Sequence, residues 1–409
     1  MLGSTGVTRS APAAKPRAFD VVLSTQGEYL DVYFADGAGG FAKKVLVSPD
    51  DPSHGGRHLN GKVCFFPRNA PRAFRDKFVV ADDTYRESCI DGHQSRCGVT
   101  NRRDPRYVGR DPDGWGVFNR DATWTQRIIT AGTLTNRDAR GAADPQGCAF
   151  DTNANMIGND VGSGSPGVAD GNLLMFFADG GYTQHCFLAT DLMQPGQIVF
   201  DGGNVYVPLS GGGMILKYTP PFPKTAKDCV PKVQPEGDTV MVPDAAHTPG
   251  VTRLVIPGAF TPSSMVRRPA GSSISGAPAS WYVASVLVTP TILEVIETPT
   301  PAVSLGVPIP VVPPFVPENP IGMDVATDGS ALYFAELNLT LPDLSTGCGR
   351  VSLVRFDPST GIPSQPEVIR DNLQFPDGIS VFPSTRFAVD FAKLPNAPSF
   401  PATHCSGSG

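Results

Sequence analysis

The 409-residue sequence lacks several features that would assign it at once to a broad class of proteins. No apolar run reaches the roughly 20 residues of a transmembrane helix, so no membrane span is predicted. Basic residues are not in excess, because 33 lysines and arginines face 39 acidic residues and the net charge is −6. Such a chain offers no basic field to a phosphate backbone, which argues against nucleic acid as a partner.

The motifs of several enzyme classes are missing as well. The sequence contains no Gly-x-Ser-x-Gly nucleophile elbow, no glycine loop followed by Lys-Ser or Lys-Thr, and no HExxH motif. The 44 glycines and 41 prolines make up about a fifth of the chain, which excludes long helices.

The eight cysteines form no CxxC or CxxCH motif, which argues against zinc ribbons and c-type haem. Cys89 and Cys97 enclose a short polar loop, and we predict a local disulfide between them in an oxidising compartment. Free buried thiols are the alternative, and the pairing of the other six cysteines stays open. No signal peptide follows Met1, so a secreted or periplasmic location is inferred from cysteine usage alone.

One phrase recurs along the chain. It comprises a proline or polar residue before glycine, an alternating apolar strand, a tight turn, and a second strand that ends in a small or acidic residue. The copies begin at residues 59, 145, 195, 262 and 320. A sixth copy is split, because residues 376–381 supply its first strand and residues 30–36 a second strand.

Several copies continue into a third apolar strand, at residues 173–178, 214–218 and 351–356. Six such meanders, one of them divided between the two ends of the chain, predict an all-β, six-bladed β-propeller. Ring closure by strands from both termini removes exposed sheet edges. The predicted propeller domain spans residues 20–395, between tails at 1–19 and 396–409. A pair of β-sandwiches is the alternative.

Two segments do not fit the repeat. Residues 89–136 are rich in Arg, Asp and Gly and are expected to form a long loop excursion from the second blade. Residues 299–320 are rich in proline, which excludes a central strand. They are expected to form an outer edge strand or a polyproline wrap.

The phrases Pro145-Gln-Gly, Pro320-Ile-Gly-Met-Asp-Val-Ala-Thr-Asp-Gly and Phe375-Pro-Asp-Gly-Ile-Ser-Val381 resemble the blade motifs of one group of six-bladed propellers. This is the NHL, gluconolactonase and strictosidine synthase group. In its calcium-dependent lactonases and phosphotriesterases, an Asn or Asp before such a glycine binds a metal at the top of the central channel. The resemblance implies Asn60 and Asp377 as metal ligands and Ca²⁺ as the cofactor. Gln146 departs from the pattern but still offers an oxygen.

The geometry of a propeller agrees with this implication. The innermost strands of a propeller bring their first residues to one channel mouth, so ligands far apart in sequence converge there. Calcium takes six to eight oxygen ligands, which further polar side chains would help to supply. Candidates lie at the ends of second strands: Asp82, Asp83, Asn159, Asp160 and Glu336. For Asn60 and Asp377 the alternative is an Asx turn that caps the start of a strand.

Two residues are candidates for proton transfer. His58 lies two residues before Asn60 and is a candidate general base, with a surface position as its alternative. Glu336 is the other candidate. His58, His93, His185 and His247 follow different blades, so a convergent four-histidine iron or copper site, as in carotenoid-oxygenase propellers, is a further alternative.

These observations favour an exported, metal-dependent hydrolase of a small ester, lactone or related small-molecule substrate. A non-catalytic secreted propeller that binds a ligand is the first alternative. A redox propeller with a histidine-bound metal or a quinone is the second.

Overall fold

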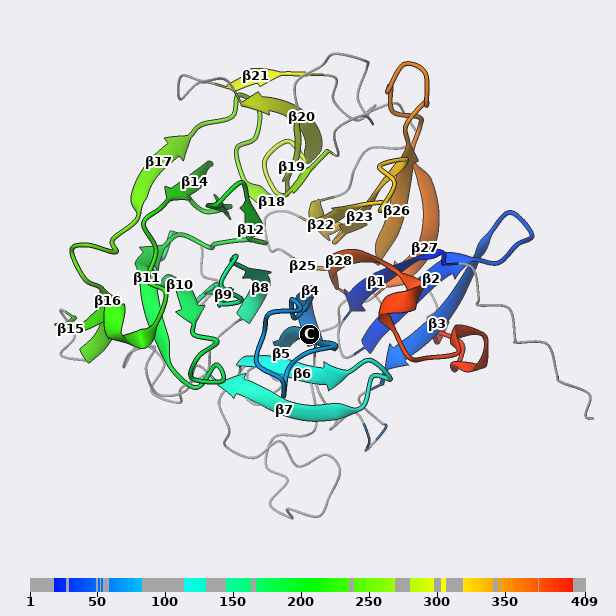
Figure 1. Ribbon diagram of the computed structural model, residues 1–409. Helices are drawn as coiled ribbons and strands as arrows, with labels where there is room; N and C mark the ends of the chain where they lie inside the picture. The colour runs from blue at the N-terminus through cyan, green and yellow to red at the C-terminus, as the bar shows by residue number, and fades with distance from the viewer. Residues whose placement is uncertain are drawn as a thin grey trace, which may run out of the picture.

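We describe the protein from a computed structural model. The structure describes residues 18–26, 29–48, 51, 53, 59–82, 114–129, 145–162, 167–234, 239–268, 280–297, 303–306, 319–340, 345–346, 348–373 and 375–399. Six four-stranded antiparallel sheets surround one axis, so the chain is a six-bladed β-propeller (Figure 1). The described residues contain no α-helix and no helix that is long and apolar enough to cross a membrane. The predicted fold class is confirmed.

Four blades take their strands in chain order from the axis outward. Blade 1 has β4 (Leu59–Phe65), β5 (Lys77–Asp82), β6 (Gly114–Asn119) and β7 (Trp124–Ile129). Blade 2 has β8 (Pro145–Phe150), β9 (Met156–Asp160), β10 (Gly171–Phe176) and β11 (His185–Leu192). Blade 4 has β18 (Pro262–Arg267), β19 (Trp281–Ser285), β20 (Thr291–Glu297) and β21 (Val303–Leu305). Blade 5 has β22 (Pro320–Val325), β23 (Ala331–Glu336), β26 (Gly349–Arg355) and β27 (Glu367–Leu373).

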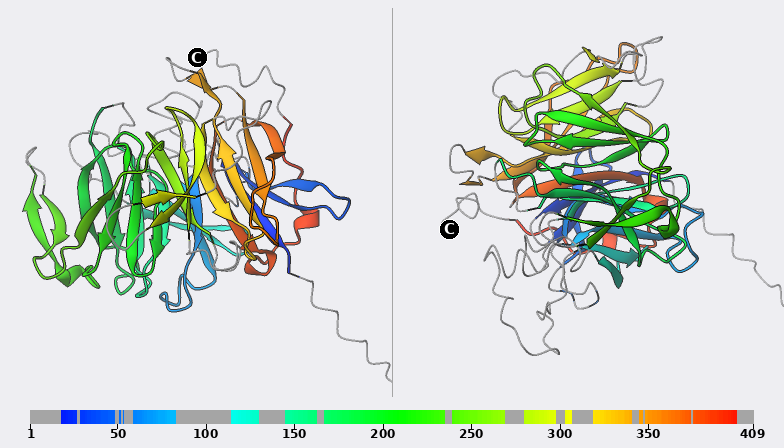
Figure 2. Two further views of the ribbon diagram at one scale, coloured as in Figure 1. Left: turned by 90° about the horizontal axis from the view of Figure 1, so that it is seen from above. Right: turned by 90° about the vertical axis from the view of Figure 1, so that its left-hand side faces the viewer.

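Blades 3 and 5 carry insertions. Blade 3 consists of β12 (Val199–Asp201), β13 (Asn204–Leu209), β14 (Met214–Thr219) and β17 (Gly250–Leu254). Before its last strand come the 3-10 helix η2 (Ala226–Asp228) and a hairpin of β15 (Cys229–Val233) and β16 (Thr239–Pro243). This hairpin projects from the rim of the disc in Figure 2. In blade 5, β24 (Leu339–Thr340) pairs with β25 (Ser345–Thr346).

Blade 6 closes the ring with strands from both ends of the chain. Its innermost strand is β28 (Pro376–Pro383), followed by β1 (Asp20–Gln26), β2 (Tyr29–Ala35) and β3 (Phe41–Val47). The predicted closure is confirmed, but residues 30–36 form the third strand and not the second. β1 gives little signal in the sequence, because its apolar stretch covers only Val21, Val22 and Leu23.

The core lies between the blades, so blade strands are buried on both faces. Along β23, Tyr333 and Ala335 pack in a cluster with Ile379 of blade 6, whereas Leu332 and Phe334 pack with Tyr282 of blade 4. This explains the nearly continuous apolar runs of the second strands. Each fully buried side chain of this size contributes about 1.5–3 kcal/mol.

The expected loop excursion at 89–136 is wrong in part. This segment contains β6 and β7, which are the outer strands of the blade that begins at Leu59, numbered blade 1 here. Trp115, Val117 and Phe118 of β6 are fully buried. The segment as a whole is rich in Arg, Asp and Gly, so its composition did not indicate the short apolar strand β6. In the proline-rich segment, β21 pairs with β20 as an outer edge strand, as one of the two alternatives predicted.

The segment after β28 contains η3 (Ser384–Arg386) and η4 (Phe391–Lys393) and returns along the outside of blade 6. Backbone hydrogen bonds of 3.0 Å join Val45 N to Pro395 O and Ala397 N to Lys43 O. They cover the outer edge of β3, which would otherwise be open to pairing. Contacts of the propeller continue to Pro398, whose carbonyl accepts a hydrogen bond from Arg370.

Two disulfides tie blades together. Cys64 of β4 bonds to Cys148 of β8, and Cys186 of β11 bonds to Cys229 at the start of β15. Cys348 is also disulfide-bonded. The predicted pair of Cys89 and Cys97 lies outside the described residues.

Candidate functional site

The first residues of the six innermost strands lie at one end of the central channel. Each strand pairs antiparallel with the next, so its start faces the end of the second strand, as in the pairs Leu59 with Asp82 and Pro320 with Glu336. The innermost strands surround the axis in Figure 1. We call this end the channel rim and define it by Asn60, Gln146, Gly196, Ser263, Ile321 and Asp377.

Glycines bring the backbones into close contact at the rim. A Cβ atom on Gly61, whose φ is +62°, would lie 1.6 Å from the carbonyl oxygen of Gln146. A Cβ atom on Gly378 would lie 1.7 Å from the carbonyl oxygen of Gly61. Only glycine allows such an approach, so Asn60 and Asp377, which precede these glycines, are gathered with Gln146 on three adjacent blades.

Asp377 is the central polar group of the rim. Its side chain is buried, with the residue 2% exposed. Its Oδ2 accepts a hydrogen bond of 3.0 Å from Gly61 N, and its Oδ1 accepts one of 3.3 Å from Gln146 Nε2. Burial raises the pKa of Asp377 to about 6. No cationic side chain pairs with Asp377 among the described residues.

Asn60 is brought to the same place. Its Oδ1 accepts a hydrogen bond of 2.7 Å from Gly61 N, the same N–H that Asp377 binds. The structure therefore brings together the three predicted ligands, Asn60, Gln146 and Asp377. This contact joins adjacent residues, whereas the side chain of an Asx turn binds the N–H two residues on, so the hydrogen bond from Gly61 N is not that of an Asx turn.

Gln197 follows the rim residue Gly196, just before β12, and was not among the residues predicted for the site. It is buried, and its Nε2 donates a hydrogen bond of 3.1 Å to the carbonyl oxygen of Asp377 across the ring. A signal existed in the sequence, because Pro195-Gly196-Gln197 contains the same residues as Pro145-Gln146-Gly147 with glycine and glutamine exchanged.

Asn159 of β9 supports the rim from behind. Its Oδ1 accepts a hydrogen bond of 2.8 Å from Gly147 N, and its Nδ2 donates one of 2.7 Å to Pro195 O. Asn159 thus links the strand starts that carry Gln146 and Gln197. It holds the backbone in place and does not itself contact Asp377 in any described hydrogen bond.

The acidic ends of the second strands are engaged within their own blades. Glu336 is fully buried and accepts two hydrogen bonds from Arg350, at 2.7 and 3.1 Å, and one from Ser352 at 2.8 Å. Asp82 pairs with Arg127 at 3.1 Å. Paired carboxylates of this kind hold the ends of strands together.

An ion pair lies deeper in the channel. Lys62 Nζ of β4 is 3.9 Å from Asp324 Oδ2 of β22. β28, the innermost strand of blade 6, lies between β4 and β22 and contacts both. The ion pair therefore connects the two blades on either side of blade 6. Asp324 Oδ2 also accepts a hydrogen bond of 2.9 Å from Val381 N.

The histidines are not gathered at the rim within the part of the chain described. His185 lies on β11, the outermost strand of blade 2, and burial lowers its pKa. His247 follows β16 of the projecting hairpin. His58 and His93 lie outside the described residues, so the role predicted for His58 stays a prediction.

No protein-family model and no curated protein matches this sequence. Solved structures match at low identity. One is a putative 6-phosphogluconolactonase from Bacteroides uniformis, 10% identical, with 89% of this chain and 99% of that chain covered and a TM-score of 0.46. Another is the periplasmic gluconolactonase of Pseudomonas aeruginosa, which is 11% identical, with 89% of this chain and 99% of that chain covered and a TM-score of 0.45. A chain of a nidogen/laminin complex is 12% identical, with 88% of this chain and 98% of that chain covered and a TM-score of 0.48. These identities and TM-scores are too low to assign an activity to this chain.

Proposed function

We propose that the protein is a hydrolase of small esters or lactones, with a calcium ion held at the channel rim. The observation that carries the proposal is the buried carboxylate of Asp377, whose described side-chain partners are neutral N–H donors. An ionised carboxylate is costly to bury unless it is paired or coordinated. A bound cation would offset that cost.

The side chains of the rim fit calcium by their chemistry. Asp377, Asn60 and Gln146 carry carboxylate or amide oxygens, which hard cations such as calcium prefer. Gln197 offers a fourth oxygen, because its described hydrogen bond to Asp377 O uses only Nε2. The described residues contain no group of three or more His, Cys, Asp or Glu that could hold a metal ion, so amide oxygens beside the single carboxylate would have to supply the protein ligands. Water and substrate would complete the six to eight ligands of calcium.

Calcium bound at the rim would supply a Lewis acid that polarises the carbonyl of an ester or lactone. The chain's own groups prepare the site. Gly61 N–H and the Gln146 amide orient the Asp377 carboxylate, and Gln197 fixes the backbone beneath it. We keep His58 as the proposed proton carrier. Glu336 is the weaker candidate, because its oxygens already accept hydrogen bonds from Arg350 and Ser352.

One observation favours the alternative of a binding propeller without catalysis. Gln197 crosses the ring, and both oxygens of Asp377 already accept hydrogen bonds. A polar plug that only holds the blades together would have the same features. Under either proposal we place the protein outside the cytoplasm, because disulfides persist in oxidising compartments.

Hydrolysis assays separate the two proposals. A panel of aliphatic lactones and p-nitrophenyl esters is offered to the purified protein with calcium and with EDTA. We expect turnover that requires calcium and falls at least about 100-fold in Asp377→Asn. Asp390→Asn, an exposed carboxylate paired with Lys393 far from the rim, is the matched control and should retain full activity. Calcium binding without any turnover would favour the binding propeller, and turnover that is unchanged in EDTA and in Asp377→Asn would contradict the proposed site.

A further inference from the structure

An arginine-rich loop lies on the face of the disc opposite the channel rim. It covers residues 67–77, where the chain turns from β4 into β5, and β4 starts at the rim. The loop contains four cationic side chains and one carboxylate, although the net charge of the whole chain is −6. In the left view of Figure 2 this loop, in blue, extends below the disc. We call residues 67–77 the basic loop.

Two successive turns and an aromatic anchor fix the shape of the basic loop. Ala70 N donates a hydrogen bond of 3.0 Å to Pro67 O, and Phe74 N donates one of 2.8 Å to Pro71 O. The buried ring of Phe74 lies edge-on to that of Tyr182 in blade 2, with 4.7 Å between the ring centroids. The loop therefore rests on the neighbouring blade in one conformation.

Arg68 and Arg72 occupy the second positions of these two turns, and both are exposed. Within the described part of the chain, neither arginine takes part in an ion pair or a side-chain hydrogen bond. Arg75, by contrast, is held within the loop, because its Nε donates a hydrogen bond of 2.8 Å to Ala70 O. Two unpaired guanidinium groups on a fixed loop suit an anionic partner surface.

An acidic surface lies on the same face of the disc, at blade 5. Asp328 lies in the turn from β22 into β23, and Asp357 follows β26. A hydrogen bond of 2.9 Å from Phe356 N to Ser330 O holds these two turns together. Both carboxylates are exposed, and hydrogen bonds from the Ser359 side chain and neighbouring backbone N–H groups lower the pKa of Asp357 to about 2.

Two further carboxylates extend this surface. Asp20 accepts hydrogen bonds from Thr327 N at 2.9 Å and from Thr327 Oγ1 at 2.6 Å, which brings the start of β1 to the turn of blade 5. Glu367, at the start of β27, pairs with Arg355 at 3.5 Å, and both side chains are exposed. No other cation of the described residues pairs with these carboxylates. We call the following four residues the acidic turns: Asp20, Asp328, Asp357 and Glu367.

The basic loop and the acidic turns lie on either side of blade 6. β28, the innermost strand of blade 6, contacts both β4 of blade 1 and β22 of blade 5. Two copies can be laid face to face about a two-fold axis that runs through blade 6, parallel to the face. Such an axis exchanges the positions of blade 1 and blade 5, so each basic loop meets the acidic turns of the other copy.

We propose that two copies of the chain associate through the faces opposite the channel rim, with the basic loop of each copy on the acidic turns of the other. Opposite charges then meet twice in one closed contact, which fixes the orientation of the copies and speeds their association. Both channel rims face away from the contact. The proposal therefore does not rest on the proposed hydrolase function.

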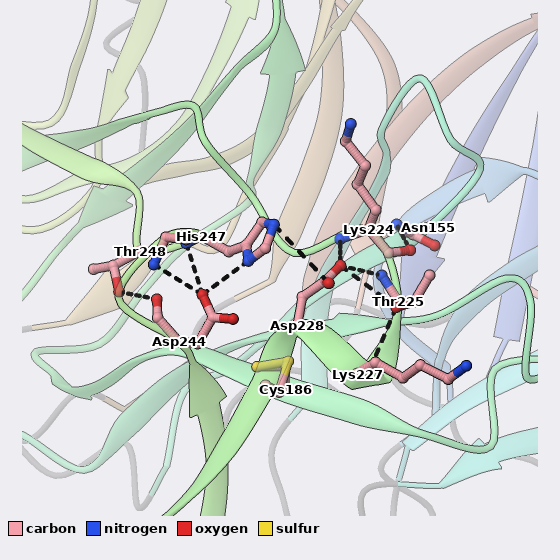
Figure 3. A network of polar contacts seen from close by, with 11 residues as sticks. Asn155, Cys186, Lys224, Thr225, Lys227, Asp228, Asp244, His247 and Thr248 are labelled. Carbon is pink, nitrogen blue, oxygen red and sulfur yellow. Dashed lines mark hydrogen bonds and ion pairs between the residues drawn. A yellow bond between two sulfur atoms is a disulfide. The ribbon is translucent and has the colours of Figure 1, made fainter.

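Two lysines on the same face provide a matched control. Lys224 precedes η2 and Lys227 lies within it, and both side chains are exposed. Their ammonium groups extend away from Asp228 and Asp244 in Figure 3. Asn155 Nδ2 donates a hydrogen bond of 3.1 Å to Lys224 O, so these lysines lie beside blade 2. The proposed axis does not bring them onto the acidic turns.

Sedimentation velocity of the full chain, over a range of protein concentrations, measures the association. We expect a monomer–dimer equilibrium at about 0.1 M salt that weakens at least tenfold at about 1 M, because salt screens the charges. Arg68→Glu with Arg72→Glu should weaken the dimer at least 100-fold, since each substitution acts twice in a two-fold contact. Asp328→Lys with Glu367→Lys should cause a similar loss from the opposite side.

An equimolar mixture of the two double variants should form a heterodimer, because opposite charges meet again in both halves of the contact. Lys224→Glu with Lys227→Glu makes the same change in net charge as the arginine variant and should dimerise like the wild type. Circular dichroism shows that each variant is folded.

The proposal is overturned by a wild type that stays monomeric at about 0.1 M salt. A mixture of folded variants that does not associate also overturns it. An equal loss in the lysine control would show that net charge alone governs association, and would overturn the docking of the basic loop on the acidic turns.

Discussion

The carboxylate of Asp377 and the amide oxygen of Asn60 accept the same backbone N–H, that of Gly61, at 3.0 and 2.7 Å. These residues are 317 positions apart in the chain, and closure of the ring by blade 6 is what places them together. Because Gly61 N–H donates to both, Asn60 Oδ1 and Asp377 Oδ2 lie close together at the channel rim. The proposed function depends on this convergence.

The stability of the cation-free protein should depend on the titration of Asp377. Burial raises its pKa from 3.8 to about 6, so the folded protein holds this proton more tightly than the unfolded chain. The resulting stabilisation is complete below about pH 4 and is lost as the pH rises through 6. The shift corresponds to about 3 kcal/mol.

In EDTA, Asp377→Asn cannot ionise and should therefore be more stable than the wild type at pH 7.5, by up to about 3 kcal/mol. Near pH 4.5 the difference should shrink. Urea unfolding at the two pH values measures it. A wild type that is as stable as the variant, or more stable, at pH 7.5 in EDTA would contradict the uncompensated burial of Asp377.

Gly61→Ala should strongly destabilise the protein. The added Cβ would lie 1.6 Å from Gln146 O on a residue with φ of +62°, so two blades would have to separate. Gly203→Ala is the matched control, because Gly203 has φ of +81° and a Cβ added there would meet nothing within 4 Å. We expect the control to lose about 1–2 kcal/mol from backbone strain and Gly61→Ala to lose at least twice that, by urea unfolding. Equal losses would show that the blades are not in contact at Gly61.

Glu336→Gln tests whether this residue acts in proton transfer or in structure. The substitution removes the negative charge of Glu336, to which Arg350 donates two hydrogen bonds. We expect a loss of about 3–5 kcal/mol of stability, as for other broken buried pairs. The pH profile of any hydrolysis by the remaining folded protein should be unchanged. A stable variant with an altered pH profile would instead support the predicted catalytic role.

Removal of β28 and the segment after it should abolish folding of the whole ring. Truncation after Leu373 takes away the innermost strand of blade 6 and the cover over the edge of β3. Removal of residues 1–17, before the first described contacts, is the control and should leave a cooperative unfolding transition. A soluble truncated protein that unfolds cooperatively would contradict closure by both ends of the chain.

The architecture could be predicted because each blade repeats one local pattern. The Asp328-Gly329 turn between two alternating strands marks a hairpin without reference to the rest of the chain. Less local features were missed. The apolar stretch of β1 covers only three residues, and β6 lies within a segment whose composition is polar, so neither strand could be recognised from its sequence.

The rim could be predicted only in part. Asn60, Gln146 and Asp377 occupy equivalent places before a glycine, which the repeat reveals. Gln197 was missed because its glycine comes first, and its contact with Asp377 crosses the ring between blades that are not sequence neighbours. The ion pair of Lys62 and Asp324 has no sequence signal, since each residue is an ordinary charged residue within its own strand.

The calcium site at the channel rim is tested by calcium titration of the wild type and of Asp377→Asn, by calorimetry at pH 7.5. We expect one calcium ion bound by the wild type, no detectable binding by the folded variant, and unchanged binding by Asp390→Asn. Wild-type affinity should fall as the pH drops through 6, because protonation of Asp377 competes with the metal. Equal calcium affinity in the wild type and Asp377→Asn, or none in either, would contradict the calcium site at the rim.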